Sequence, residues 1–324
     1  MKYLKNKVAL LVAMMLLVMG LAGCGEKAED SNGANSENST HSADSGDATD
    51  VADTVYPLEL TDTNGETVVI DAEPQRIVSV APNLTELVYK LGAGDKLVGR
   101  SDYCDYPAEA ANVESVGTIT GPDIEKIISL DPDLVIVSTH FDEANTEKLA
   151  EADIQVLTLY DQGNVDGVYT VIDILGQALN KNEEANACVE EMKTTIADVE
   201  SKVKDLEKPT VYYVVGYGEY GDYTAGGDTF IHGIIEAAGG DNIAKDISGW
   251  NISLEVLVEA DPEIIIINES MKDDFMSAPT YSELTAVKEG KVYTLDVNML
   301  ERQGYRNAEG IKALAEILHP EAFK

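Results

Sequence analysis

The chain has 324 residues, of which 59 are acidic and 23 are lysine or arginine, so its formal net charge at pH 7 is -36. Such a charge repels the phosphates of nucleic acids, which argues against a nucleic-acid partner and favours a partner with a cationic surface. Arginine is scarce, because only Arg76, Arg100, Arg302 and Arg306 occur.

Residues 1–23 have the pattern of a bacterial lipoprotein signal peptide. Three lysines among the first seven residues precede an apolar run, 8–18, that is too short to span a membrane. The "LAGC" that follows resembles a lipobox, in which Cys24 becomes the lipidated N-terminus. The alternative is an ordinary secretory signal with an incidental cysteine. A lipidated cysteine would hold the protein at the extracytoplasmic face of the cell membrane.

Residues 24–54 predict a disordered, acidic tether behind that cysteine. The segment contains almost no large apolar side chain, so it cannot bury enough surface to offset the entropy lost on ordering. A flexible coil of this length reaches roughly 30 Å. We therefore expect a leash between the membrane and a folded body.

Residues 55–180 predict an N-terminal α/β lobe that begins with a β-hairpin around Asn64-Gly65. After Pro74, short apolar runs alternate with amphipathic segments. We expect strands at "RIVSVA", "KLVG", "DLVIV" and "IQVLTL", and helices at "PNLTELVYKLG", "DIEKIISL" and "ANTEKLAEAD". Because the strands are apolar on both faces, they predict a parallel sheet covered by helices.

Residues 181–208 predict one amphipathic helix of roughly 40 Å, since apolar residues recur every three or four positions until Pro209. A helical connector is stiff and implies little opening and closing. Residues 209–324 then repeat the strand and helix alternation and predict a C-terminal α/β lobe. The predicted fold is α/β, with two Rossmann-like lobes joined by one long rigid helix and a ligand cleft between them.

A repeated segment supports this duplication. "IEKIISLDPDLVIV", residues 124–137, returns without a gap as "LEVLVEADPEIIII", residues 254–267. Each copy predicts a capped helix, with the apolar stripe Ile124, Ile127 and Ile128 matched by Leu254, Leu257 and Val258. Glu125 and Glu255 fall in the first turns, where the helix dipole alone favours a carboxylate by about 0.3–1 kcal/mol. The other interpretation is that they bind arginines of a two-fold symmetric partner.

Ligands of open α/β sheets lie beyond the carboxyl ends of the strands, which in this chain carry aromatic and polar side chains. The loop "GYGEYGDYTAGG" fits either stacking on a flat ligand or a tyrosine-rich turn over the core. Trp250 fits ligand contact or packing, and His140 fits an axial metal contact or an ordinary hydrogen bond. Cys104 and Cys188 could form a disulfide in an oxidising compartment or remain free thiols. The histidine spacing predicts no closed metal site.

The segments "SVAPNLTELVYKLGAGDKLVGRSDYCDYPAE", "GPDIEKIISLDPDLVIV" and "ISLEVLVEADPEIIII" resemble the substrate-binding lipoproteins of ABC importers, over residues 75–318. The resemblance is to the cobalamin and iron-complex class, also called class III, with a helical backbone. It implies that Glu125 and Glu255 dock onto arginines of a permease dimer that works with ATPase subunits, and that Tyr103 contacts a corrin. The predicted ligand-binding residues of this monomeric binder are Asn83, Tyr103, Tyr217, Trp250, Arg302 and Tyr305.

The predicted ligand is a transported cobalt corrinoid, with no intrinsic cofactor. Relatives that hold cobalamin tend to place aromatic residues where this chain has Ile119 and Ser138, so a ferric siderophore or haem is the alternative. Anionic ferric catecholates call for a basic cleft, which four arginines hardly supply. The chain lacks G-x-S-x-G, P-loop, H-E-x-x-H and dinucleotide-binding motifs, so we do not expect an enzyme. A surface adhesin or structural lipoprotein is the alternative from another class.

Overall fold

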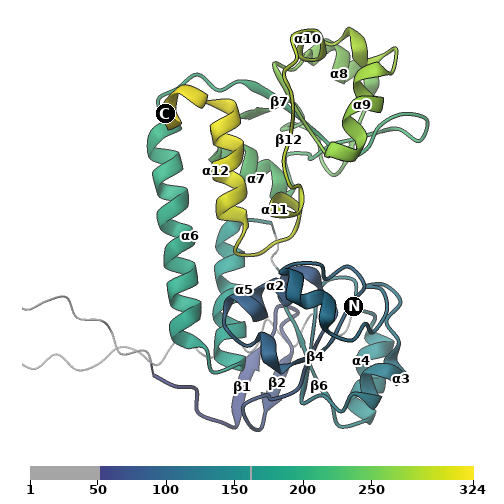
Figure 1. Ribbon diagram of the computed structural model, residues 1–324, viewed down its shortest axis with the longest axis vertical. Helices are drawn as coiled ribbons and strands as arrows, with labels where there is room; N and C mark the ends of the chain where they lie inside the picture. The colour runs from purple at the N-terminus through teal and green to yellow at the C-terminus, as the bar shows by residue number, and fades with distance from the viewer. Residues whose placement is uncertain (1–51, 161–162) are drawn as a thin grey trace, which may run out of the picture. The chain divides into compact units, whose positions relative to one another are not determined.

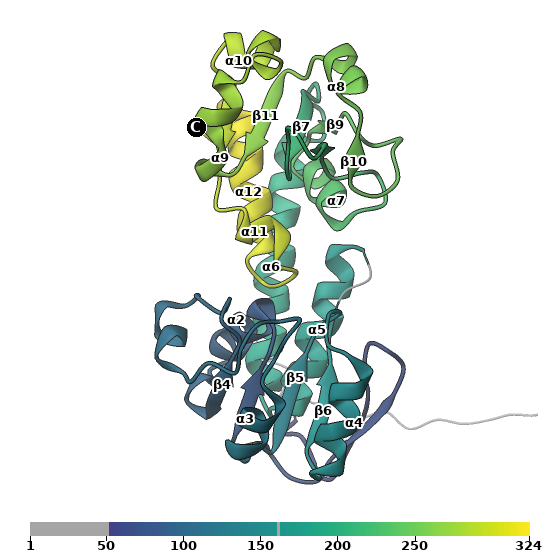
Figure 2. The same ribbon diagram turned by 90° about the vertical axis from the view of Figure 1, so that its right-hand side faces the viewer.

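The computed structural model describes residues 52–160 and 163–324. The predicted signal peptide, Cys24 and nearly all of the predicted tether lie outside these residues. The described chain forms two α/β lobes, one above the other in Figures 1 and 2, joined by helices along one side. In this part of the chain, no helix combines the length and the apolar character needed to cross a bilayer.

The N-terminal lobe is built on a parallel sheet whose strands are predicted by their apolar runs. Its order is β4 (Leu97–Arg100), β3 (Ile77–Ser79), β5 (Leu134–Val137) and β6 (Gln155–Thr158). Side chains alternate between the faces, so Ile136 joins one apolar cluster and Val135 another. Both faces are therefore buried, as the sequence predicts.

Helices and a hairpin cover this sheet. The hairpin pairs β1 (Leu58–Thr61) with β2 (Thr67–Ile70), and the Thr63 N–H at its tip donates to the carbonyl of Thr158, 3.1 Å away. One helix, at Val165–Ala178, was not predicted from the sequence. The helices are α2 (Pro82–Lys90), α3 (Ile124–Ser129), α4 (Glu143–Glu151) and α5 (Val165–Ala178), with 3-10 turns at Gly94–Lys96 and Ala108–Asn112.

The C-terminal lobe repeats the topology of the first sheet. Its parallel strands are β12 (Val292–Thr294), β11 (Ile264–Ile267), β7 (Thr210–Val214) and β9 (Asp241–Asn242), in that order. Read from β9 to β12, its strands run second, first, third and fourth in chain order, which is the order of β4, β3, β5 and β6 in the first sheet. The lobe adds a short antiparallel pair, β8 (Asp222–Tyr223) and β10 (Asn251–Ile252).

The helices of the C-terminal lobe include four that were not predicted from the sequence, at Glu269–Ser277, Thr285–Lys288, Asn298–Glu301 and Asn307–Leu318. In chain order, the helices are α7 (Phe230–Ala237), α8 (Leu254–Ala260), α9 (Glu269–Ser277), α10 (Thr285–Lys288), α11 (Asn298–Glu301) and α12 (Asn307–Leu318), with 3-10 turns at Tyr281–Glu283 and Pro320–Phe323.

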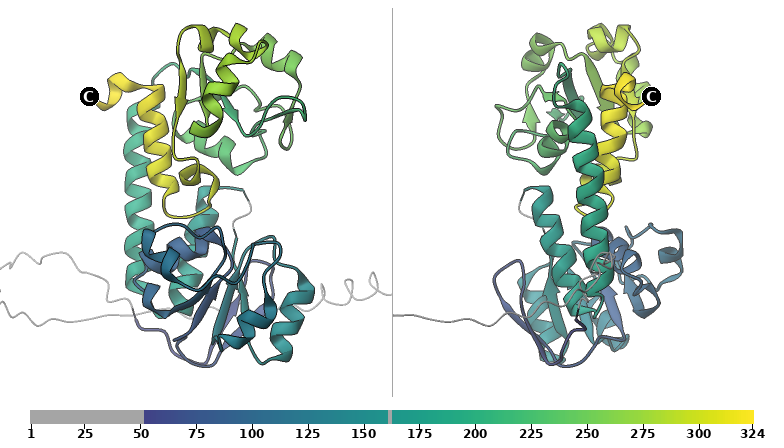
Figure 3. Two further views of the ribbon diagram at one scale, coloured as in Figure 1. Left: turned by 45° about the vertical axis from the view of Figure 1, so that its right-hand side comes forward. Right: turned by 90° about the vertical axis from the view of Figure 1, so that its left-hand side faces the viewer.

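The connecting helix α6 (Asn182–Val203) is shorter than the 181–208 predicted. The chain turns after Val203, and the Leu206 N–H donates to the carbonyl of Val203 at 3.0 Å. Pro209 also disfavours helical backbone at the residue before it. At 1.5 Å per residue, α6 still spans about 33 Å. It packs on α5 and α12 alongside both lobes (Figure 3). One apolar cluster therefore runs from the N-terminal sheet, through these helices, to the C-terminal sheet.

The repeated Asp-Pro has a backbone reason. Asp131 and Asp261 follow α3 and α8 with φ of 50° and 39°, in the left-handed region. Aspartate tolerates this region better than most residues, and the proline after it cannot continue the helix. Each copy therefore ends its helix and enters the next strand in the same way.

Gly176 offers a test of the contact between α5 and α6. A Cβ at Gly176 would lie 2.5 Å from the Cβ of Ala185, closer than real Cβ contacts. We expect Gly176→Ala to lower the free energy of unfolding by about 1–3 kcal/mol, because the helices must separate. Gly233→Ala is the matched control, since nothing lies within 4 Å and alanine should stabilise α7 by about 0.5–1 kcal/mol. Urea unfolding measures both, and equal stability of the two variants would contradict a tight contact.

Candidate functional site

A cavity of about 1030 Å³ lies between the lobes. Its walls come from loops at the carboxyl ends of strands in both lobes, as expected for open α/β sheets. The N-terminal lobe contributes Ala81, Pro82, Asn83, Tyr103, Ile119, Ser138, Thr139 and His140. The C-terminal lobe contributes Val215, Tyr223, Asp228, Thr229, Phe230, Ile231, Gly249, Trp250, Asn298, Glu301, Arg302 and Gln303.

Tyr103 stands on the loop after β4 and is 55% exposed, so its ring is available to a ligand. A buried cluster of small polar groups holds the base of this loop. The Thr85 hydroxyl donates to that of Ser79 at 2.8 Å and lies 3.0 Å from the Cys104 sulfur, which is 3.1 Å from the Ser101 hydroxyl. The Cys104 sulfur therefore belongs to this polar cluster at the base of the loop. Both Cys104 and Cys188 are buried free thiols in this structure.

Trp250 lies on the C-terminal wall and is 44% exposed. Its loop is held by Asp228, whose carboxylate accepts the Gly249 N–H at 2.7 Å and a short hydrogen bond from Ser248. These bonds lower the pKa of Asp228 below its usual value, the Ser248 bond most. Asp228 was not among the site residues predicted from the sequence. The Gly226-Gly227 pair before Asp228 was the available signal for a tightly packed loop. A Cβ on Gly227 would lie 1.9 Å from the carbonyl oxygen of Lys245, so a larger residue does not fit there.

The other wall residues that the sequence singled out are placed as follows. Asn83 lies in the first turn of α2, and its amide donates to the carbonyl of Gln303 at 3.0 Å, which joins the lobes beside the cavity. Ile119 and Ser138 both line the cavity. His140 also lines it, with its Nδ1 atom 2.9 Å from the Thr139 hydroxyl.

Tyr217 and Tyr305, both predicted ligand contacts, are not among the described residues that line this cavity. The Tyr217 ring packs edge-on against Phe275 and Tyr281, with centroid distances of 5.0 and 5.3 Å. It anchors the glycine loop to a separate apolar cluster of the C-terminal lobe, which contains Phe275 and Tyr281, and Tyr223 from the same segment lines the cavity instead. The Tyr305 ring packs on the main core, with the Lys90 ammonium 5.2 Å from its centroid.

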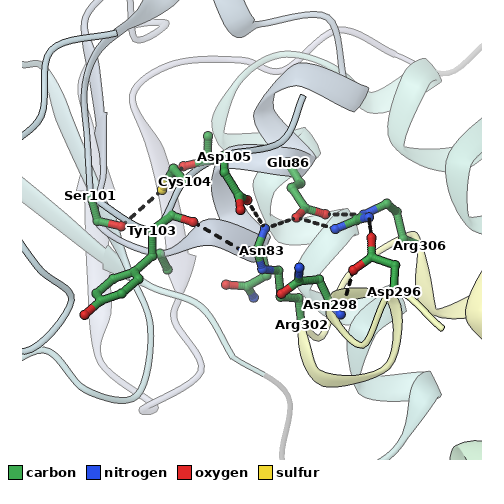
Figure 4. Close-up of polar contacts among 12 residues, drawn as sticks. Asn83, Glu86, Ser101, Tyr103, Cys104, Asp105, Asp296, Asn298, Arg302 and Arg306 are labelled. Atoms are coloured by element: carbon green, nitrogen blue, oxygen red, sulfur yellow. Dashed lines mark hydrogen bonds and ion pairs between the residues drawn. The ribbon is translucent and has the colours of Figure 1, made fainter. Parts of the chain in front are cut away.

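Arg302 lines the cavity but its guanidinium is bound by groups of the opposite lobe (Figure 4). Its Nη1 atom donates to Glu86 at 2.8 Å and to Asp105 at 2.7 Å, and its Nη2 atom donates to the Tyr103 carbonyl at 3.3 Å. Burial opposes ionisation of Asp105, but the hydrogen bond and the charge of Arg302 outweigh it and lower the pKa of Asp105.

Glu86 is the centre of this interlobe ion cluster, which we define as Glu86, Asp105, Asp296, Arg302 and Arg306. Only 2% of Glu86 is exposed. Arg306 binds it with two hydrogen bonds, Nε to Oε2 at 2.7 Å and Nη2 to Oε1 at 2.8 Å, and also binds Asp296 at 3.0 Å. Burial works against the charge on Arg306, yet these carboxylates raise its pKa. The cluster joins α2 of one lobe to the α11–α12 segment of the other.

Glu125 and Glu255 are exposed in the first turns of α3 and α8, which lie on different lobes and both away from α6 (Figure 1). Their surroundings differ. Lys126, next to Glu125, pairs with Glu114. The apolar stripe predicted on α8 is wrong in part: Leu257 is buried, whereas Leu254 and Val258 are exposed together with Val256. The reason is that α3 packs on α4, while α8 packs through Leu257 into the apolar cluster of the C-terminal lobe that contains Phe275 and Tyr281.

Two α/β lobes built on similar parallel sheets, a connecting helix and a cavity between the lobes define the class of two-lobed solute-binding proteins. Residues 77–299 match the periplasmic binding protein family. The chain is 32% identical to the ABC transporter substrate-binding lipoprotein YvrC of Bacillus subtilis (strain 168), over 99% of this chain and 100% of that one. It therefore belongs to the periplasmic binding protein family, whose members are transport components and not enzymes.

Two further proteins are similar to this chain. The cobalamin-binding protein of Halobacterium salinarum (strain ATCC 29341 / DSM 671 / R1) is 29% identical over 82% of this chain and 74% of that protein. The periplasmic heme-binding protein RhuT from Roseiflexus sp. RS-1, in apo form, has a TM-score of 0.70 at 23% identity, covering 76% of this chain and 99% of RhuT. The second likeness concerns the fold alone. Within the family, the protein's role is that of the substrate-binding component of an ABC transporter, which serves a membrane permease and its ATPase.

Glu86 offers a test of the interlobe ion cluster. We expect Glu86→Ala to lower the free energy of unfolding by about 3–5 kcal/mol, because it leaves two largely buried arginines without their shared carboxylate. Glu321→Ala is the control, since Glu321 pairs only with Lys324 on the surface and should change little. Chemical unfolding of both variants makes the comparison, with Glu86→Gln as a milder substitution. A loss no larger than that of the control would show that the cluster does not stabilise the lobes.

Proposed function

We propose that this protein is the extracytoplasmic binding component of an ABC importer for a cobalt corrinoid, anchored to the membrane through a lipidated Cys24. The observation that carries the proposal is a large cavity lined by an exposed aromatic ring from each lobe, Tyr103 and Trp250, and by few charged groups. The cobalamin-binding relative supports the same ligand class.

The chemistry of the walls suits a corrinoid. Aromatic rings stack on flat macrocycles, and a binding site needs only a few placed polar groups to orient its ligand. The polar wall groups include the amides of Asn83, Asn298 and Gln303 and the hydroxyls of Ser138 and Thr139. Amides and hydroxyls both donate and accept hydrogen bonds, so they match the amide-bearing rim of a corrinoid.

The charge of the cavity wall distinguishes between the candidate ligands. Among the described residues that line the cavity, the arginine is Arg302 and there is no lysine, while Asp228 and Glu301 are carboxylates. A strongly anionic ferric catecholate would meet a wall that is acidic on balance. Haem is the second candidate, because the phenol of Tyr103 and the imidazole of His140 are groups that ligate haem iron and both lie in the cavity.

Delivery would use Glu125 and Glu255 as docking residues on arginines of a permease dimer. Their exposure and their matched places in the repeated helix–strand unit support this assignment. Carboxylate–arginine pairs are strong and directional, so one pair per lobe would fix the orientation of the protein. The exposed apolar residues beside Glu255 would add contact area on the C-terminal lobe.

Ligand binding is tested by thermal unfolding of the purified lipoprotein. Cyanocobalamin at 100 times its dissociation constant should stabilise the protein by about 2.7 kcal/mol. Tyr103→Ala and Trp250→Ala should each weaken binding about tenfold, because each removes one aromatic face. Tyr220→Ala is the control, since Tyr220 is 87% exposed and does not line the cavity. Stabilisation by haem or a ferric siderophore, with none by cyanocobalamin, would overturn the corrinoid assignment.

Docking is tested by the double variant Glu125→Arg with Glu255→Arg. Ligand affinity should stay as in the wild type, whereas cellular uptake of labelled cyanocobalamin should fall to background, because two attractive pairs become repulsive. The control is Glu190→Arg with Glu316→Arg, which makes the same change of charge on α6 and α12. Normal uptake by the first pair, or equal loss by the control pair, would remove the docking assignment.

A further inference from the structure

Arg302 is a cation in the cavity wall whose charge is already engaged. Its side chain is 15% exposed, and the hydrogen bonds from Nη1 and Nη2 go to Glu86, Asp105 and the Tyr103 carbonyl. All three partners belong to the N-terminal lobe, whereas Arg302 follows α11 of the C-terminal lobe (Figure 4). A ligand carboxylate could bind this guanidinium only in competition with carboxylates that are fixed in place.

The two carboxylates that engage Arg302 are not equivalent. Glu86 is shared, because Arg306 holds both of its oxygens. Asp105 makes its ion pair with Arg302 alone, at 2.7 Å, and its side chain is 66% exposed on the loop that carries Tyr103. In the interlobe ion cluster, two guanidiniums face three carboxylates, so the net charge is one negative. Asp105 and Asp296 each pair with one arginine, and removal of either would leave the cluster neutral; Asp105 is the one bound to the arginine in the cavity wall.

We propose that Asp105 is a specificity-determining residue, which neutralises Arg302 and makes the cleft discriminate against anionic cargo in favour of neutral cargo. This inference rests on the proposed binding function and narrows its ligand class. Guanidinium is the preferred protein partner of carboxylates and phosphates, so a free Arg302 in the wall would attract the anionic groups of a cargo. With Asp105 in place, an anionic cargo meets paired charge and the nearby carboxylates of Asp228 and Glu301.

The same ion pair also holds the Tyr103 loop, so the charge and the positioning must be separated. Arg302 reaches both Asp105 and the Tyr103 carbonyl from across the cleft. Asp105→Asn keeps an oxygen that accepts the bond from Nη1 but removes the negative charge. Asp105→Ala removes both the accepting oxygen and the negative charge. Because the side chain is largely exposed, neither change leaves a buried cavity.

The test compares two matched pairs of probes on the full-length lipoprotein. One pair is cyanocobalamin and its derivative with one propionamide hydrolysed to a propionate; the other is haem dimethyl ester and haem. The quantity measured is the dissociation constant of the anionic probe divided by that of its neutral partner. Asp105→Asn should lower this ratio about tenfold, because a neutral amide holds the guanidinium less strongly than a carboxylate does, so the anionic group of the probe can take over a charge-assisted hydrogen bond worth about 1.5 kcal/mol. The effect should shrink in 1 M salt, where the Debye length is about 3 Å.

Two further variants show whether the effect acts through Arg302. Asp228→Asn also removes one carboxylate from the wall, but Asp228 is bonded to the neutral groups of Ser248 and Gly249, so its loss releases no guanidinium. The removal of one charge roughly 10 Å away in water should shift the ratio only about twofold. In an Arg302→Met background, Asp105→Asn should shift the ratio no more than Asp228→Asn does, because no guanidinium is left to release. Asp105→Ala should weaken both members of a pair, since the Tyr103 loop loses its tie.

The outcomes separate this inference from the proposed function. An unchanged ratio in Asp105→Asn, an equal shift in Asp228→Asn, or a full shift that persists without Arg302 would each overturn the role of Asp105. Failure of cyanocobalamin to bind, with the expected shift in the haem pair, would overturn the corrinoid ligand and support the role of Asp105. Binding of none of the four probes would overturn both.

Discussion

The arrangement of the cleft depends on the ion cluster beside it, where Glu86 of α2 lies between Arg302 and Arg306 of the other lobe. Burying these charges is costly unless each finds its partner, so the hydrogen bonds hold only in one relative position of the lobes. The apolar cluster that continues through α5, α6 and α12 acts in the same direction, because sliding these helices would unpack both sheets. The cavity between the lobes is therefore a property of the unliganded chain.

A preformed cavity has consequences for how a binding protein works. A ligand that enters it orders few side chains and moves little backbone, so more of the contact energy remains as affinity. Release then needs an external cause, since a rigid pair of lobes does not open by itself. In the proposed function this cause is the permease, which would contact one exposed carboxylate on each lobe, Glu125 and Glu255, at places related by the duplication.

Local patterns predicted much of the fold, because each strand is a short apolar run and the repeated unit has its own caps at Asp123 and Ser253. The wall positions of Tyr103 and Trp250 followed from their loops at the cleft. Tyr217 and Tyr305 do not line the cavity, and the sequence could not show this, since a tyrosine in a glycine-rich or polar segment looks the same whether its ring faces a ligand or the core. The apolar side of α8 failed for a related reason, because burial depends on which neighbour covers a helix.

The roles of Glu86 and Asp105 could not be found in a sequence with 59 acidic residues, where carboxylates lie near every site by chance. Arginine, which is rare in this chain, was the more informative residue type. All four arginines bind the protein itself: Arg76 donates to the carbonyl of Asp131 at 2.8 Å, Arg100 to those of Ala110 and Ser101, and the other two to Glu86. Carbonyls and fixed carboxylates thus engage every guanidinium of the chain. A cleft built this way offers a ligand aromatic surface and neutral polar groups, and its selectivity against anions follows from where the arginines are used.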